Sequence, residues 1–128
     1  MKRRRYIITS DPALLKGAPV CYEVGYERMG RTMIKHVVFF KFKPEASEGE
    51  RKSALNDLRA LPDKIDVIRN YEVGEDLLGA PRSWDGVLIG TFDDLGALEK
   101  YQRHDDHLPV VMKMQQLCDA IGSVDYEF

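Results

Sequence analysis

The sequence predicts an α+β domain of the ferredoxin-like type over residues 33–128, with the element order β-α-β-β-α-β. Two observations favour this fold. Four segments are rich in apolar, β-branched and aromatic residues, mostly in alternation, as strands are. Between the first and second of them, and between the third and fourth, apolar residues recur at helical spacing. We therefore expect a four-stranded antiparallel sheet with helices on one face.

The first half of this domain is expected to form a strand, a helix and a second strand. The first strand runs from Ile34 to Lys43 and ends before Pro44, which cannot donate to a strand ladder. Ser47-Glu48-Gly49-Glu50 is a capping box that starts a helix, and Pro62 is expected to follow its end. Ile65 to Val73 alternates and predicts the second strand. The apolar stripe of the helix is Leu55, Leu58 and Leu61.

The second half is expected to form a loop, a strand, two helices and a last strand. Residues 74–83 form the loop, and Val87 to Phe92 is a strand with apolar side chains on both faces. Either Asp93 or Asp94 can cap the next helix, which holds Leu95, Leu98 and Tyr101. Either Asp105 or Asp106 can cap the last helix, with Pro109 in its first turn and Val111, Met114, Leu117 and Cys118 on its buried side. Val124 to Phe128 is the fourth strand.

Residues 1–32 are patterned more weakly than the rest of the chain. Cys21 to Glu27 alternates like a strand. Two interpretations stay open: the chain starts at Met33 or Met29 and the leader is upstream translation, or the leader is a genuine extension that adds an edge hairpin. A basic start at residues 2–5 precedes a segment too short and polar for the apolar core of a signal peptide.

Length, charge and motifs narrow the class of protein. A chain of 128 residues fits one domain that can bury a core without disulfides or a structural metal. A net charge of -2 gives no electrostatic case for nucleic acid, and no apolar run is long enough to span a membrane. Two distant cysteines, Cys21 and Cys118, suggest reduced thiols in a cytoplasmic protein. Phosphate-loop, dinucleotide and nucleophile-elbow motifs are missing, so we predict no cofactor.

The face of the sheet turned away from the helices is expected to be apolar. Val37 and Phe39 lie on that face of the first strand. An exposed apolar patch usually marks an interface, and burial against a second copy closes a two-fold assembly. The sequence therefore predicts a homodimer, and the alternative is a monomer whose leader covers the sheet.

The candidate acid–base residues are all three histidines and one tyrosine. His36 shares a strand face with Val38 and Phe40, which is expected to meet the helices. His104 and His107, three residues apart, point to one side if the helix continues between them, and Tyr101 is expected to face inward. A histidine can remove a proton near neutral pH, and a tyrosine can donate to a developing enolate oxygen. Such groups could catalyse enolisation, aldol closure or isomerisation.

Plainer roles for the same residues stay open. His104 can be a solvated helix cap, while His36, His107 and Tyr101 can be packed core groups with satisfied hydrogen bonds. A metal site built from the three histidines and an aspartate has weak support from the spacing, and none is predicted.

Three segments of the chain resemble the stress-responsive dimeric α/β-barrel (Dabb) family. They are the first strand at residues 33–43, the tyrosine and paired histidines at residues 101–107, and the last strand at residues 123–128. The family often has proline and alanine between its histidines, where this chain has Asp105-Asp106, and the leader has no counterpart. The resemblance implies two ferredoxin-like subunits whose sheets close into a barrel, with an internal pocket in each subunit.

The resemblance also implies roles for individual residues. The chain is similar at several site positions to a plant member, olivetolic acid cyclase, which closes a linear polyketide by an aldol-type reaction. By motif position His107 matches its catalytic histidine, Tyr101 its catalytic tyrosine and His36 a further pocket histidine. His104, Val38 and Phe40 are expected to contact a substrate.

The first hypothesis is a cofactor-free enzyme acting on a small, mostly apolar carbonyl compound, with His107 as the base, Tyr101 as the orienting acid and His36 as a polar pocket wall. The alternatives are a non-catalytic stress-response or ligand-binding dimer, and, by fold analogy, a cofactor-free monooxygenase or lactone isomerase of the wider dimeric-barrel group.

Overall fold

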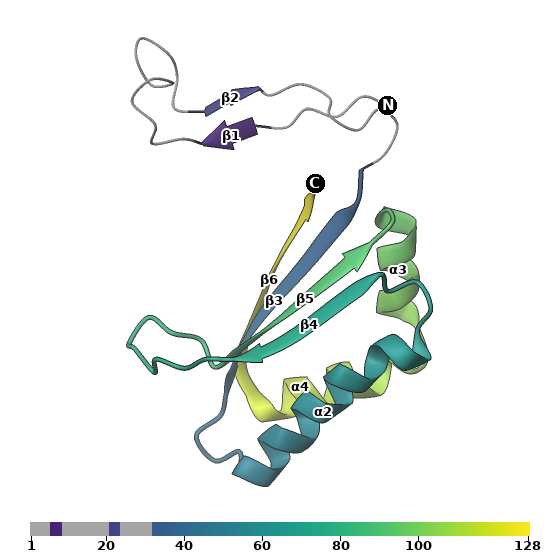
Figure 1. Cartoon of the computed structure of the whole chain (residues 1–128). Coiled ribbons are helices and arrows are strands. Elements are labelled where there is room, and N and C mark those ends of the chain that lie inside the picture. Colours follow the sequence, from purple (N-terminus) through teal and green to yellow (C-terminus); the bar gives the residue numbers. More distant parts are fainter. Residues whose placement is uncertain (1–5, 9–20, 24–31) are drawn as a thin grey trace. The chain divides into compact units, whose positions relative to one another are not determined.

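A computed structural model describes residues 6–8, 21–23 and 32–128 of the chain, which divides into two units, residues 1–32 with Phe128 and residues 33–127 (Figure 1). In the first unit, strand β1 (Tyr6–Ile8) pairs antiparallel with strand β2 (Cys21–Glu23). These strands form a two-stranded sheet of their own. The strand expected over Cys21 to Glu27 is present at Cys21–Glu23, and residues 24–27 lie outside the described residues.

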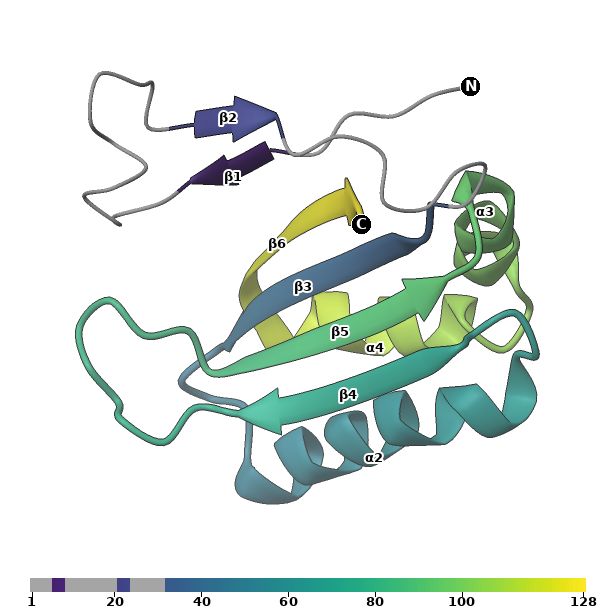
Figure 2. The same cartoon turned by 45° about the horizontal axis from the view of Figure 1, so that its top comes forward.

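The second unit is built on a four-stranded antiparallel sheet with the order β4-β5-β3-β6. The α2 and α4 helices lie side by side along one face of the sheet, and α3 lies at the end where β5 stops (Figures 1 and 2). This arrangement confirms the predicted ferredoxin-like α+β fold. The strands are β3 (Ile34–Phe42), β4 (Asn70–Glu75), β5 (Gly86–Phe92) and β6 (Cys118–Glu127), and the helices are α2 (Glu48–Lys64), α3 (Leu95–Arg103) and α4 (Leu108–Leu117).

The start of α2 agrees with the sequence and its end does not. Ser47 Oγ accepts a hydrogen bond from the Glu50 amide at 3.1 Å, and the Glu50 carboxylate accepts one from the Ser47 amide at 3.0 Å, which confirms the capping box. The helix runs on to Lys64, so the expectation that it ends before Pro62 is wrong. The fully buried Leu61 and Ile65 hold the last turn against the core, and the Ile65 amide donates to the Leu61 carbonyl at 2.9 Å.

The second strand of the domain begins later than the alternation suggested. It starts at Asn70, whereas a start at Ile65 was expected. Ile65 instead ends α2, and the Ile68 amide donates to its carbonyl at 3.4 Å in a turn. The alternation at Ile65 and Val67 therefore reflects a turn that packs against the core, because both side chains belong to or touch the buried cluster.

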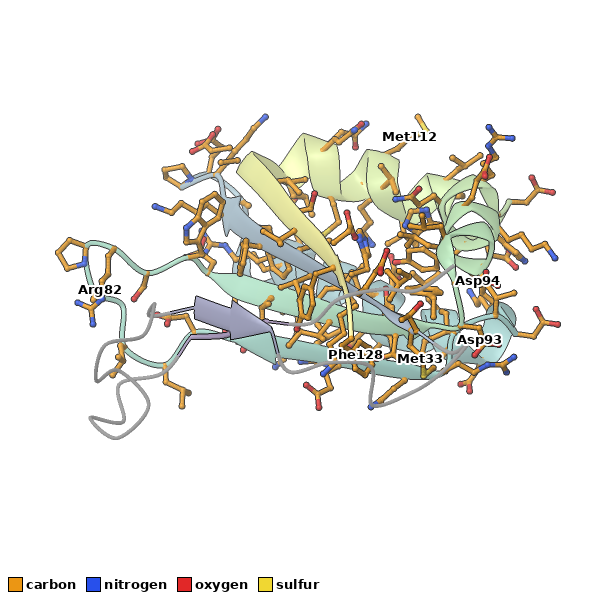
Figure 3. All side chains as sticks on the ribbon, turned by 90° about the horizontal axis from the view of Figure 1, so that it is seen from above. Met33, Arg82, Asp93, Asp94, Met112 and Phe128 are labelled. Atoms are coloured by element: carbon orange, nitrogen blue, oxygen red, sulfur yellow. The ribbon has the colours of Figure 1, made fainter. Side chains whose placement is uncertain are left out.

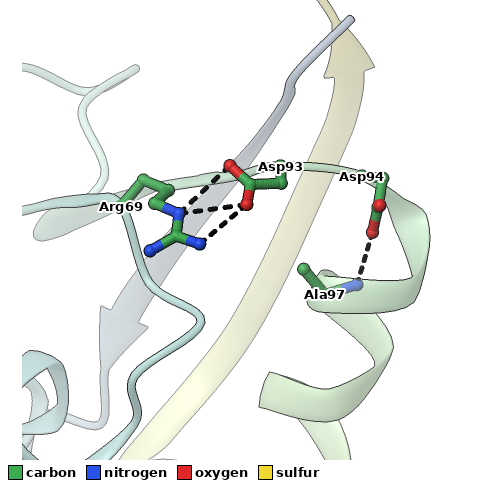
Figure 4. Close-up of polar contacts among 4 residues, drawn as sticks. All are labelled: Arg69, Asp93, Asp94 and Ala97. Carbon is green, nitrogen blue, oxygen red and sulfur yellow. Dashed lines mark hydrogen bonds and ion pairs between the residues drawn. The ribbon is translucent and has the colours of Figure 1, made fainter. Parts of the chain in front are cut away.

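The two aspartates before α3 have separate roles. Asp94 caps the helix, since its carboxylate accepts from the Ala97 amide at 2.8 Å (Figure 4). Asp93 instead accepts two hydrogen bonds from the Arg69 Nε at 3.1 Å and one from Nη2 at 2.8 Å (Figure 4). Of the two residues named as possible caps, Asp94 is thus the one that caps, and Asp93 ties the helix start to the turn before β4.

The last helix starts without the expected aspartate cap. His107 is the residue before α4 and its side chain makes no capping hydrogen bond, so a cap by Asp105 or Asp106 is wrong. The chain turns sharply here instead, because the His104 carbonyl accepts from the amides of His107 at 2.9 Å and Leu108 at 3.2 Å. Proline in the first turn is confirmed by Pro109.

The last strand is twice as long as the sequence suggested. Val124 to Phe128 was expected, and β6 begins at Cys118. The small or polar residues on both sides of Ile121 hide the strand pattern at 119–123. Pairing with β3 nevertheless holds the segment extended, from Cys118 opposite Phe42 to Glu127 opposite Ile34. Cys118 therefore lies at the junction of α4 and β6 rather than inside the helix.

The two faces of the sheet carry different side chains. The face toward the helices supplies much of the core, whose largest fully buried members are Tyr101, Phe40, Phe92, Ile34, Leu61 and Ile65. On the other face Val37 of β3 lies opposite Ile89 of β5 and Val124 of β6, and Val124 and Tyr126 are 53% and 45% exposed. The outward side of α4 carries Met112 (Figure 3). No helix within residues 32–128 is long and apolar enough to cross a membrane.

Candidate functional site

A cavity of about 540 Å³ lies between the sheet and the helices. Residues of β3 and β6 form one wall, α3 and α4 form the other, and Leu58 of α2 and Leu88 of β5 complete it. Its polar groups include His36, Tyr101, Gln102, His107 and Ser123. Its apolar groups include Val38, Phe40, Val110, Val111, Met114 and Ile121. The cavity is therefore mainly apolar, with a group of titratable side chains.

His36 reaches the cavity from β3 and is held by a carboxylate. Its side chain is buried among the helices, and its Nδ1 is bonded to the Asp125 carboxylate. Asp125 lies directly opposite His36 on β6, so the strand register brings the two together. Because an ionised carboxylate only accepts hydrogen bonds, Nδ1 carries a proton and Nε2 is the nitrogen left for a ligand.

Tyr101 reaches the cavity from α3 as a protonated phenol. The residue is fully buried, and burial raises the pKa of its hydroxyl to about 12. The hydroxyl lies 2.7 Å from the hydroxyl of Tyr71 on β4. At neutral pH the Tyr101 side chain is therefore a hydrogen-bond donor rather than a phenolate.

His107 is the third titratable group and lies just before α4. Its ring centre is 4.2 Å from that of Tyr101. Its Nδ1 lies 3.1 Å from the Gln102 carbonyl, which only accepts, so Nδ1 carries the hydrogen and Nε2 keeps its lone pair. Burial lowers the pKa of His107 from its ordinary value of 6.5, so the ring is neutral near pH 7 and can accept a proton.

His104 is not brought together with the other two histidines. The expected common side required a continuous helix, but α3 ends at Arg103 and a turn separates the two histidines. The His104 Nδ1 accepts from the Asp106 amide at 3.1 Å. The residue lines a separate surface hollow with Lys100 and Asp66 and does not line the cavity. The expected substrate contact of His104 therefore has no geometric support, whereas Val38 and Phe40 do line the cavity.

Two residues of the site had no role in the sequence analysis. Asp125 could have been found from the alternation of the last strand, because Val124 and Tyr126 on one face leave Asp125 on the face of His36. Tyr71 gave no such signal, since its contact with Tyr101 joins β4 to α3 across the core. Both contacts depend on tertiary structure.

The remaining polar residues limit the chemistry of the cavity. Burial raises the pKa of the Cys118 thiol to about 11, so this thiol is protonated and a poor nucleophile at neutral pH. The residues that line the cavity include no lysine or arginine. Asp119, near the start of β6, supplies a carboxylate at the end of the cavity away from His36. No group of histidine, cysteine, aspartate or glutamate within residues 32–128 has the arrangement of a metal site. The arrangement can supply a base, a neutral hydrogen-bond donor and apolar contacts.

The comparison with known protein families gives a match over most of the chain. The family described as Stress responsive A/B Barrel Domain matches residues 34–128. A stress-response A/B barrel domain-containing protein of Arabidopsis thaliana is 28% identical over 95 residues, which are 73% of this chain and 36% of that protein. The chain thus spans about a third of the length of that relative.

Solved structures share the fold. A dimeric protein of unknown function with a ferredoxin-like fold from Bacteroides fragilis is 32% identical, with a TM-score of 0.65 over 75% of this chain and 96% of that one. A hydroxynitrile lyase from Passiflora edulis is 16% identical, with a TM-score of 0.69 over 75% of this chain and 93% of that one. The second likeness concerns the fold alone, and it shows that this fold can carry an enzyme.

Proposed function

We propose that this chain, which belongs to the stress-responsive A/B barrel domain family, binds a small and mostly apolar carbonyl compound in its cavity and performs acid–base chemistry without a cofactor. One observation carries the proposal: His36, Tyr101 and His107, which come from three different segments, line one cavity. Polar groups that converge in an otherwise apolar cavity are typical of ligand sites.

His107 is the base of the proposed reaction. Its hydrogen bond to the Gln102 carbonyl fixes the hydrogen on Nδ1, and its lowered pKa keeps Nε2 unprotonated at neutral pH. A neutral imidazole nitrogen beside the ligand can remove a proton from the carbon next to a carbonyl group. The electron pair of the broken C–H bond then moves to the carbonyl oxygen and gives an enolate.

Tyr101 stabilises the enolate, and His36 is a polar group beside it. The neutral Tyr101 hydroxyl donates to the oxygen that becomes negative, where a preorganised donor in a dry site is most effective. The Asp125 carboxylate orients His36, which leaves its Nε2 as a polar group of the cavity wall beside the ligand. The enolate carbon attacks a second carbonyl carbon of the same compound and closes a ring. The protonated His107 then gives its proton to the alkoxide oxygen that this attack creates, which restores the neutral base. The polyketide-like substrate is part of the proposal and rests on the motif positions of His36, Tyr101 and His107, which resemble those of olivetolic acid cyclase.

The first experiment is a thermal-shift screen with polyketide-like and phenolic compounds, followed by turnover assays on every compound that stabilises the protein. His107→Gln keeps a polar group of similar length and removes the base. We expect this variant to bind the compound and to lose roughly 100-fold or more in turnover rate, the usual contribution of a general base. Unchanged turnover would reject His107 as the base, and binding without any turnover in the wild type would favour the ligand-binding alternative.

A matched pair of aspartates tests the role of His36. Asp125→Asn removes the charge next to His36, whereas Asp119→Asn removes a charge at the far end of the same cavity. We expect Asp125→Asn to slow turnover at least roughly tenfold, because a mispositioned or wrongly protonated imidazole loses efficiency. Asp119→Asn should leave the turnover rate close to that of the wild type. Equal effects of both changes would mean that only the overall charge of the cavity matters.

The proposed assembly is a homodimer that buries the sheet face opposite the helices. That face carries apolar groups at Val37, Phe39 and Ile89, and the related Bacteroides fragilis protein is described as dimeric. A two-fold pair of identical apolar faces is self-complementary. Sedimentation of the full chain at micromolar concentration tests it, and a stable monomer would reject the dimer.

A further inference from the structure

The tyrosine behind the cavity shares a hydrogen bond with the tyrosine inside it. The hydroxyls of Tyr71 and Tyr101 are 2.7 Å apart, and the two rings meet edge to face with centres 6.1 Å apart. Tyr101 lines the cavity and Tyr71 does not. In the part of the chain that the structure describes, each hydroxyl is the other's only hydrogen-bond partner. The pair therefore works as one unit with one side turned to the cavity.

Counting the hydrogens of this pair favours one direction of the bond. Two hydroxyls have two hydrogens, and one hydrogen lies between the oxygens. If Tyr101 donated, the Tyr71 hydrogen would have no acceptor among the described residues and would depend on water, to which this partly buried side chain has restricted access. If Tyr71 donates, the Tyr101 hydrogen is the one left over, and it can turn to the cavity.

The groups around Tyr101 agree with the second direction. The His107 ring centre is 4.2 Å away, and that of His36 is 5.9 Å away, so the potential acceptors lie on the cavity side. The side toward β4 offers Tyr71. Burial raises the pKa of both tyrosine hydroxyls, so both carry their hydrogens at neutral pH.

We propose that Tyr71 is a positioning residue, which donates to Tyr101 and thereby directs the Tyr101 hydrogen into the cavity as a site for enolate or phenolate oxygens. The reason is cooperative: a hydroxyl that accepts a hydrogen bond becomes a stronger donor, and hydrogen bonds to an anionic oxygen are the strong ones. The role of the cavity rests on the proposed function, but the order of the two hydrogens does not.

Two small probes of nearly the same shape separate this role from simple packing. 4-Nitrophenol can bind as an anion whose absorption spectrum reports its ionisation, and 4-nitroanisole has a methyl ether in place of the ionisable hydroxyl. We expect Tyr71→Phe to weaken binding of 4-nitrophenolate roughly tenfold, because one charge-assisted hydrogen-bond chain is lost. Binding of 4-nitroanisole should change less than roughly twofold, since the phenylalanine ring keeps the packing and the cavity wall.

Control variants assign the probe to the cavity. Tyr101→Phe should lose at least as much phenolate affinity as Tyr71→Phe, and Tyr126→Phe, which removes an exposed hydroxyl on β6, should bind both probes as the wild type does. Equal weakening of both probes in Tyr71→Phe, or no weakening of either, overturns the positioning role. Failure of the wild type to bind either probe counts against the proposed function. The positioning role of Tyr71 is then tested by the titration without ligand.

A titration without any ligand tests Tyr71 by itself. Replacement of Tyr101 by 3,5-difluorotyrosine lowers the pKa of the phenol and gives a fluorine NMR signal. If Tyr71 donates to this oxygen, Tyr71→Phe should raise the pKa of the fluorinated phenol by roughly one pH unit, a tenfold change in its ionisation. An unchanged or lowered pKa would show that Tyr71 is not a donor, whatever the cavity binds.

Discussion

The two faces of the four-stranded sheet are both apolar in their centre, but only one of them holds polar groups that converge. On β3, Phe40 is 1% exposed among the helices, and its neighbour Phe39 points the other way and packs against Trp84 with ring centres 6.0 Å apart. The helix face also carries the His36–Asp125 pair, whereas the opposite face ends in the exposed Val124 and Tyr126. The difference shows that helices turn one apolar face into a core with a cavity and leave the other face partly exposed, which is the face of the proposed dimer.

The largest expected effect separates two neighbouring phenylalanines on β3. Phe40→Ala should lower the free energy of unfolding by about 3 to 5 kcal/mol, because it opens a cavity in the core. Phe39→Ala should cost roughly half as much, since that side chain is only partly buried. Urea denaturation measures both. If the opposite face is a dimer interface, the loss in Phe39→Ala should depend on protein concentration and the loss in Phe40→Ala should not.

The next effect concerns association through the opposite face. Val37 lies between Ile89 and Val124, so Val37→Glu places a charge in the middle of that face. We expect the dimer dissociation constant to rise roughly 100-fold, or about 3 kcal/mol, because the carboxylate must lose water to be buried. Met112→Glu on the outer side of α4, a site that is 62% exposed, is the control and should leave association unchanged. Sedimentation velocity over a range of concentrations distinguishes these outcomes.

A smaller effect tests the burial of His107. The pKa of His107 is lowered in the folded chain from its ordinary value of 6.5. Below pH 6.5 the unfolded chain therefore binds a proton at His107 more readily than the folded chain does. Above pH 6.5 His107 does not affect the free energy of unfolding. As the pH falls from 6.5 through the lowered pKa, the free energy of unfolding decreases. His107→Gln should remove this part of the pH dependence, which begins near pH 6.5 and extends below it. Parallel curves of unfolding free energy for the two proteins would show that the ring is not buried.

Features that depend on a few neighbouring residues were predictable from the sequence. The Ser47 and Asp94 caps involve residues within one helical turn, and the alternation of β3 is visible in nine consecutive residues. The order of strands and helices followed from these local patterns. The end of α2 and the start of β4 could not be predicted from local patterns. The buried Ile65 packs in the same core whether it belongs to a strand, a turn or a helix end.

The candidate site was only partly predictable, because its contacts span the chain. His36 and Asp125 are 89 residues apart and meet through the register of β3 and β6. Tyr71 and Tyr101 are 30 residues apart and meet through the core. His104 shows the reverse case, since its helical spacing from His107 had no meaning once a turn separated α3 from α4.

A crystal structure of the protein with the most stabilising compound of the screen tests the central claim most directly. The account predicts the compound in the cavity between the sheet and the helices, with a carbonyl or phenolate oxygen within hydrogen-bonding distance, about 2.6 to 3.2 Å, of the Tyr101 hydroxyl. It also predicts the adjacent carbon near Nε2 of His107. A compound bound on the opposite face of the sheet, or in the cavity with its polar end turned away from Tyr101 and His107, would contradict the account.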